Sequence, residues 1–127
     1  MCGRFALNAD GQLLQQAFNL DTVPAELSPR FNIAPSQPIA VITNQNPHQL
    51  DLFKWGLVPS WSKDPSIGNK MINARVETAA EKPSFRDAFK KRRCLIPATG
   101  FYEWAQSDKT PMYVHLKDDE VFAFAGL

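Results

Sequence analysis

The sequence predicts a single α+β domain over residues 1–127, rich in β-strands and carrying short peripheral helices. Three observations support this fold class. Short apolar runs bounded by turn-forming residues recur along the chain, with the length of strands rather than helices. Only two segments have the 3.6-residue apolar spacing of an amphipathic helix. The length of 127 residues suits one hydrophobic core.

The first half of the chain holds one helix and two strands. The helix is expected over residues 10–20, with Asp10 as its N-cap. Its apolar face is formed by Leu13, Leu14, Ala17 and Phe18. Prolines then interrupt residues 24–38, which predicts extended or looping backbone there. Strands are predicted over residues 39–43 and within 50–58, joined by a turn.

The second half begins with a long polar loop, residues 59–70, that carries one isolated aromatic, Trp61. A second short helix is predicted over residues 84–91, with Ser84 as its N-cap. The remaining apolar runs have strand length and cover residues 94–98, 101–104, 112–116 and 121–126. The last two are expected to form a hairpin. Because the final run is apolar up to Leu127, we expect a domain that is incomplete at its C-terminus.

Composition excludes several classes of protein. Hydrophobic residues at 44% and charged residues at 21% are ordinary for a folded domain, and the net charge is only +1. The chain has no apolar run near the ~20 residues that span a bilayer, and its N-terminus does not resemble a signal peptide. Two cysteines, Cys2 and Cys94, are too few for a disulfide framework. We therefore expect a cytoplasmic protein that makes no use of a membrane.

Cys2 is the first candidate for chemistry because it directly follows Met1. Removal of Met1 would give Cys2 an α-amine and a thiol on adjacent carbons, a pair that no internal residue offers. The alternative is a small apolar residue at the start of a strand. Cys94, in contrast, lies in an apolar run and is expected to be an inert buried thiol.

Six motifs occur together in this chain: MCGRF, RFNIAPSQ, WGLVPSW, INARVETA, RCLIPATGFYEW and FAFAGL. In their order and spacing they resemble the N-terminal portion of the SOS-response-associated peptidase (SRAP) family, over Met1 to Leu127. The resemblance implies an abasic-site-processing enzyme of the DNA-damage response. Its partner would be single-stranded DNA containing abasic sites, to which it attaches covalently through the N-terminal cysteine. We expect a monomer, with no cofactor and no metal.

The chemistry of Cys2 fits this implication. An open abasic deoxyribose carries an aldehyde, and an α-amine with a pKa of about 7.7–8.0 is partly unprotonated near neutral pH. The amine can form an imine with the aldehyde, and the thiol of the same residue can close on the imine carbon. The product is a five-membered thiazolidine ring, which resists hydrolysis better than the imine.

Glu103 and Asn73 are the two further catalytic candidates. In a strand Glu103 shares a face with Phe101, where a carboxylate would be poorly solvated and suited to proton transfer. A surface glutamate paired with an arginine is the alternative. The amide of Asn73 offers a donor and an acceptor without charge, although asparagine is often only a turn residue. The resemblance implies that both residues belong to the active site.

Five residues are candidates for DNA binding. Arg4 and Arg75 lie beside catalytic candidates and suit phosphate contact, and Trp61 suits stacking on a base or covering the core. The resemblance implies that Asn32 and Pro35 line the DNA channel. Ser62 stands where some relatives have a second aromatic, which predicts weaker stacking.

The remaining polar features are weaker. The basic run at residues 90–93 is expected to be a solvated helix end rather than a phosphate site. The resemblance also implies an active-site histidine downstream of FAFAGL, and neither His48 nor His115 lies in that motif. Two other functions stay open on the residues alone. One is a peptidase or amidohydrolase with Cys2 as nucleophile, and the other is a non-catalytic module that binds single-stranded DNA.

Overall fold

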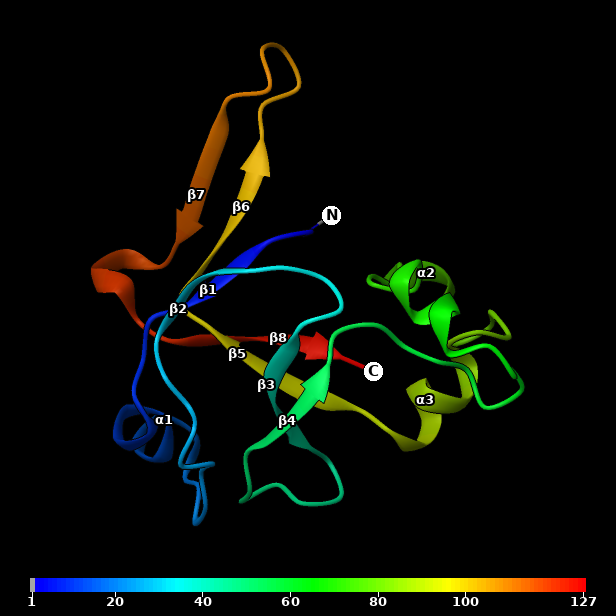
Figure 1. Ribbon diagram of the computed structural model, residues 1–127, viewed down its shortest axis with the longest axis horizontal. Helices are drawn as coiled ribbons and strands as arrows, with labels where there is room; N and C mark the ends of the chain where they lie inside the picture. Colours follow the sequence, from blue (N-terminus) through cyan, green and yellow to red (C-terminus); the bar gives the residue numbers. More distant parts are fainter. Residues whose placement is uncertain (1) are drawn as a thin grey trace.

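The computed structural model describes residues 2–127, and within them the backbone forms two antiparallel four-stranded sheets with short helices around them (Figure 1). The first sheet has the order β2-β1-β6-β7, with strands at Arg30–Ile33, Phe5–Leu7, Gly100–Trp104 and Pro111–His115. The second sheet has the order β4-β3-β5-β8, with strands at Asp51–Lys54, Pro38–Thr43, Cys94–Ala98 and Phe122–Gly126. The predicted β-rich α+β class is confirmed.

The first predicted helix is present as α1, Gly11–Phe18. Asp10 caps it as expected, because its carboxylate accepts a 2.8 Å hydrogen bond from the Leu13 amide. The predicted apolar face is only partly right. Leu14 is fully buried, whereas Leu13 is 45% exposed, because an eight-residue helix at the edge of the sheets buries a narrow stripe.

The second predicted helix is shorter than expected and is capped differently. It is α3, Arg86–Lys91, and Phe85 rather than Ser84 occupies the N-cap position, without a side-chain cap. The amides of Phe85 and Arg86 instead bond to the carbonyl of Lys82, so a preceding backbone turn satisfies them. A further one-turn helix, α2, Val76–Ala79, precedes α3 in a segment for which the sequence predicted no element.

The predicted hairpin between the last two strands is wrong. β7 pairs with β6 in the first sheet, and β8 pairs with β5 in the second sheet. The 3₁₀ turn η2, Lys117–Asp119, connects β7 to β8. The reason is packing. Phe122 and Phe124 of β8 lie in edge-to-face contact with each other, and Phe124 also contacts the Phe101 ring. All of β7 is exposed, and the β6–β7 hairpin projects from the molecule (Figure 1).

Hydrogen bonds within the polar loop that follows β4 define its conformation. The strand predicted within residues 50–58 ends at Lys54, because Gly56 turns the chain with φ 141°. The loop then contains the 3₁₀ turn η1, Pro65–Asn69, which Asp64 caps through the Ser66 amide at 2.9 Å. Leu57 donates to the Met71 carbonyl and closes the loop at its base.

The core lies where the two sheets face each other. Phe5, 3% exposed, contacts the Phe124 ring at a centroid distance of 5.9 Å, so β1 of one sheet packs on β8 of the other. β1 lies in the middle of its sheet, between β2 and β6. This central position fixes the chain that immediately follows Cys2. No helix formed by residues 2–127 has the length and apolar character that crossing a bilayer requires. Met1, which we expect to be removed, lies outside the described residues.

Candidate active site

Cys2 lies on the extended segment that leads into β1, and it is half-buried. Phe5 of β1 is opposite Phe101 of β6, and the Tyr102 amide donates a 2.9 Å hydrogen bond to the Arg4 carbonyl. The antiparallel alignment therefore continues past the end of β1. It brings the N-terminal segment alongside the β6 residues that include Glu103.

The local environment keeps the Cys2 thiol protonated. Burial raises the pKa of the Cys2 thiol above its ordinary value, and the negative charge of Glu103 raises it further. The thiol Sγ donates a 3.4 Å hydrogen bond to the Arg4 carbonyl. At neutral pH Cys2 thus carries its own proton, and a nearby carboxylate is in electrostatic contact with it.

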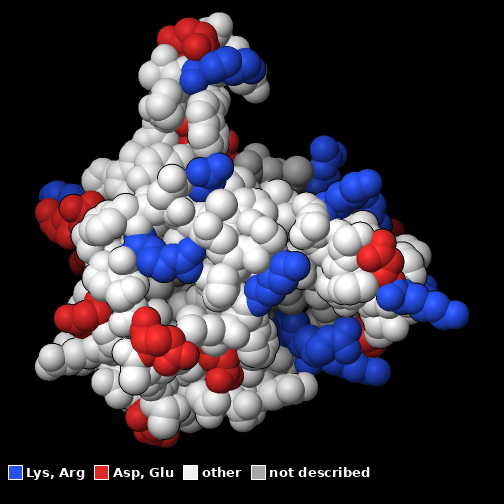
Figure 2. Space-filling model, in the orientation of Figure 1, with Lys and Arg blue, Asp and Glu red and all other residues white. Residues whose placement is uncertain are grey.

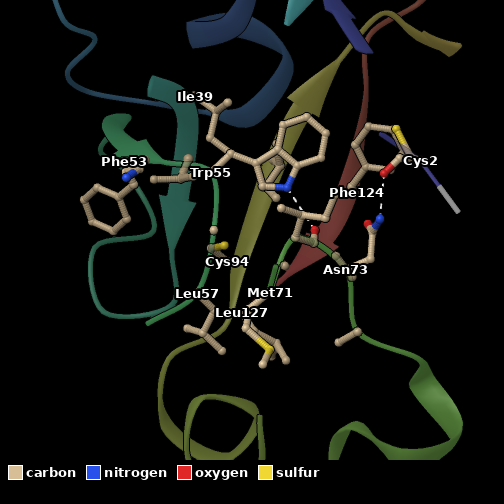
Figure 3. Close-up of a pocket in the computed structure, with 18 of the residues that line it drawn as sticks. Cys2, Ile39, Phe53, Trp55, Leu57, Met71, Asn73, Cys94, Phe124 and Leu127 are labelled. Carbon is tan, nitrogen blue, oxygen red and sulfur yellow. Dashed lines mark hydrogen bonds between the residues drawn. The ribbon is translucent and has the colours of Figure 1, made fainter. Parts of the chain in front are cut away.

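Asn73 contacts Cys2 directly. Its side-chain amide donates a 2.7 Å hydrogen bond to the Cys2 carbonyl, across 71 positions of sequence (Figure 3). Asn73 lies between η1 and α2, in a segment that leaves the loop base and approaches the N-terminus. The sequence predicted Asn73 as a site residue, and the structure places it against the predicted nucleophile.

Glu103 lies on β6 and is half-buried. The alternation of strand residues places it on the face of Phe101, whose ring packs on Phe124 in the core. After burial, the negative charge of its carboxylate also contributes to the raised pKa of the Cys2 thiol. The three predicted catalytic residues, Cys2, Asn73 and Glu103, are therefore brought together at one end of the first sheet.

Two of the predicted DNA-binding residues form a pair. The Arg4 guanidinium donates a 3.0 Å hydrogen bond to the Asn32 side-chain oxygen on β2. The Nε atom of Arg4 is buried and has no hydrogen-bond partner among the described residues. Arg4 thus has donor capacity that the protein leaves unused, two residues from Cys2.

The other three predicted DNA-binding residues lie on separate segments. Pro35 is in the turn that follows β2, and Arg75 is an exposed residue at the start of α2. Trp61 is 58% exposed on the loop, and its indole N–H reaches the Pro83 carbonyl at 3.3 Å. The indole therefore contacts the connection between α2 and α3 through one edge and leaves much of its surface to solvent.

A cavity of about 360 Å³ opens beside Cys2 and Asn73 (Figure 3). Its walls are largely apolar and come from both sheets and the loop base, including Phe5, Trp55, Met71 and Phe124. Cys94 also lines it, and burial raises the pKa of that thiol as well. Trp55, unlike Trp61, was not predicted as a site residue, because its hydrogen-bond acceptor, the Ile72 carbonyl, is distant in sequence.

The basic run at residues 90–93 behaves as a helix end. Lys91 and Arg92 both pair with Asp87 on α3, at 3.5 and 2.8 Å, and these side chains are exposed. Lys and Arg side chains gather on the side of the molecule that carries α2 and α3 (Figure 2). Within residues 2–127, no group of three or more His, Cys, Asp or Glu side chains is placed to hold a metal ion.

Comparison with known proteins identifies relatives of the whole chain. The family model described as SOS response associated peptidase (SRAP) matches residues 1–127. The abasic site processing protein YoqW of Bacillus subtilis is 48% identical over 133 residues, which cover 100% of this chain and 59% of the relative. YedK of Escherichia coli, also called an abasic site processing protein, is 31% identical over 136 residues, with the same coverage.

A solved structure shares the fold. A protein from Bacteroides thetaiotaomicron superposes with a TM-score of 0.84 at 26% identity, covering 98% of this chain and 58% of that one. The chain thus spans somewhat more than half the length of the relatives it matches.

Proposed function

The chain belongs to the SOS response associated peptidase family, and from this we propose that it processes abasic sites in single-stranded DNA by covalent attachment through Cys2. The observation that carries the proposal is the convergence on Cys2. Asn73 holds its backbone carbonyl at 2.7 Å, and Glu103 exerts its charge on the thiol. The names of the relatives, abasic site processing proteins, support the choice of substrate.

The reaction begins once Met1 has been removed and the Cys2 α-amine is free. The amine nitrogen adds to the aldehyde carbon of the ring-opened deoxyribose, and the resulting carbinolamine loses water to give an imine. The thiol sulfur then adds to the imine carbon, and the thiol proton ends on the nitrogen. The thiazolidine product contains all atoms of both reactants except one water molecule.

Each step needs a proton transfer, and in this proposal Glu103 provides it. In acid form it protonates the departing hydroxyl of the carbinolamine, and as a carboxylate it takes a proton from the thiol. The sulfur must lose its proton to form the ring, so ring closure benefits from the Glu103 carboxylate, whose charge acts on the thiol. Asn73 fixes the Cys2 carbonyl and thereby limits rotation of the reacting residue.

Arg4 supplies the first DNA contact in this proposal. Its guanidinium is partly exposed and is oriented by the hydrogen bond to Asn32, which suits contact with a phosphate oxygen. The exposed Arg75 and Trp61 offer a second cation and a stacking surface. Such a surface requires bases that are free of a complementary strand.

Intact-mass measurement after incubation with an abasic oligonucleotide tests the proposal. The expected product has the mass of the protein without Met1 plus the oligonucleotide minus one water. A complex that dissociates fully in denaturant indicates the non-catalytic binding module instead. Cleavage of peptide substrates by the thiol, without an adduct, indicates the peptidase.

A further inference from the structure

Trp55 connects three segments that the proposed reaction brings together. It follows β4 directly and opens the loop that carries Trp61. Its ring lines the cavity beside Cys2 and Asn73 (Figure 3). Neither the chemistry of Cys2 nor the proposed DNA contacts give it a role.

The side chain of Trp55 contacts the segments of both Cys2 and Asn73. Its indole N–H donates a 2.9 Å hydrogen bond to the carbonyl of Ile72, the residue before Asn73 (Figure 3). Its ring meets Phe5 edge-to-face, with centroids 5.4 Å apart and an interplanar angle of 65°. Phe5 is the first residue of the strand that follows Cys2.

The backbone of Trp55 holds a third segment. Its N–H donates to the Gln37 carbonyl, and its carbonyl accepts from the Ser36 amide, both at 2.9 Å. Ser36, in the turn that contains Pro35, has a left-handed backbone conformation with φ 68°, which is uncommon for a residue other than glycine. One residue thus joins the turn at Pro35 to the segments of Cys2 and Asn73.

We propose that Trp55 is a positioning residue that sets the location of the Asn73 amide relative to Cys2. This inference rests on the proposed function, because it concerns the rate of adduct formation at the same site. The Ile72 carbonyl is fixed by the indole, and the next side chain in sequence must reach the Cys2 carbonyl at 2.7 Å. A shift of the 72–73 peptide carries the Asn73 amide out of hydrogen-bond range.

The chemistry of the indole explains why tryptophan is used here. A phenylalanine ring at position 55 retains an apolar contact with Phe5 but has no donor for the Ile72 carbonyl. That carbonyl would then lie beside an apolar ring without its partner, and the 72–73 peptide would turn towards another donor or solvent. Misplacement by about 1 Å costs up to ~10²-fold in rate when a reaction depends on orientation.

The test compares the reaction of the Trp55→Phe variant with that of the wild-type protein on an abasic oligonucleotide. We expect the maximal rate of adduct formation to fall about tenfold or more, while the DNA concentration giving half the maximal rate stays unchanged. The side-chain NH₂ resonances of Asn73 should shift in the NMR spectrum, because the displaced amide no longer reaches the Cys2 carbonyl. Phe18→Leu in α1 is the matched control, since it shortens a core aromatic on a different element; it should lower thermal stability without changing the maximal rate.

A shape-conserving variant removes the donor alone. Site-specific replacement of Trp55 by β-(3-benzothienyl)alanine puts sulfur in place of the N–H and keeps the ring, so it serves if Trp55→Phe does not fold. An unchanged maximal rate in this variant, with unchanged Asn73 resonances, overturns the positioning role. If the unchanged protein forms no adduct that depends on Cys2, the proposed function fails instead, and the Asn73 resonances still decide whether Trp55 positions this amide.

Discussion

The Asn73 side chain donates a 2.7 Å hydrogen bond to the Cys2 carbonyl, and this contact joins the loop base to the N-terminal segment. It fixes the backbone of the residue whose amine and thiol would both react. Because Asn73 binds the carbonyl of Cys2, this hydrogen bond does not involve the thiol or the α-amine.

Cys2→Ser should convert a durable adduct into a labile one. Serine retains the α-amine and forms the imine, but it cannot close a sulfur-containing ring. Borohydride should trap the serine adduct, whereas heating without borohydride should release it. A Cys2→Ser adduct that survives heat as well as the original would exclude the thiazolidine, and acetylation of the α-amine should abolish both products.

Glu103→Gln should slow adduct formation by about 10²–10⁴-fold, the usual contribution of a general acid or base. The amide has nearly the same shape as the carboxyl, so affinity for the oligonucleotide should stay within about twofold by fluorescence anisotropy, on the order of 0.4 kcal/mol. Single-turnover rates at saturating DNA measure the effect. A Glu103→Gln protein reacting at the original rate would remove this residue from the mechanism.

The pH dependence of Cys2 alkylation provides a test without DNA. Because burial and the Glu103 charge raise the thiol pKa, the rate with iodoacetamide should reach half its maximum at a higher pH than that of a cysteine peptide. Glu103→Gln removes one raising cause, so its curve should move to lower pH. Both proteins should carry Cys94→Ser, so that only one thiol reacts, and Glu120→Gln on the exposed connection to β8 should leave the curve in place.

Arg4→Ala should weaken noncovalent capture of single-stranded DNA and make it less dependent on salt. Loss of one phosphate contact reduces the slope of log K against log salt by about 0.7 on a single strand. Lys117→Ala on η2 is the control, because it removes one positive charge from an exposed site away from Cys2 and should leave the slope unchanged. Equal slopes for Arg4→Ala and the original would show that Arg4 makes no phosphate contact.

Gly56→Ala should destabilise the fold at the loop base. Gly56 has φ 141°, and a Cβ there would meet the Gly68 carbonyl oxygen, which is backbone and cannot rotate away. We expect a loss of about 2–4 kcal/mol in the free energy of unfolding, measured by urea titration. Gly3→Ala is the matched control: nothing lies within 4 Å of its added Cβ, and its stability should change by less than about 0.5 kcal/mol.

Local sequence signals predicted the elements better than their pairing. The Asp10 cap and the apolar run of β3 are properties of neighbouring residues, and both are present as expected. The pairing of β8 with β5 instead depends on where Phe122 and Phe124 find other aromatic rings, which turn residues do not reveal. The Ser84 cap failed for a similar reason, because a backbone turn at Lys82 already satisfied the helix amides.

The sequence predicted the individual residues of the candidate site, but the contacts between them are visible only in the structure. The chemistry of Cys2 follows from its place after Met1, and this needs no structure. The contact of Asn73 with the Cys2 carbonyl spans 71 positions and depends on the loop base closing at Leu57 and Met71. Trp55 was missed because its partners are the Ile72 carbonyl and the Phe5 ring, both distant in sequence.

The position of β1 between β2 and β6 also determines when, during translation, the N-terminal strand can complete its pairing. Its partner β6 begins at Gly100, so the strand after Cys2 stays without that neighbour until about 100 further residues have been made. At roughly 5–20 residues per second, this leaves about 5–20 s in which the nascent N-terminus is open to a methionine aminopeptidase. Slower translation should therefore raise the fraction of chains lacking Met1, and intact mass would record it. The strand that follows Cys2 is made first and yet acquires its β6 neighbour late in synthesis.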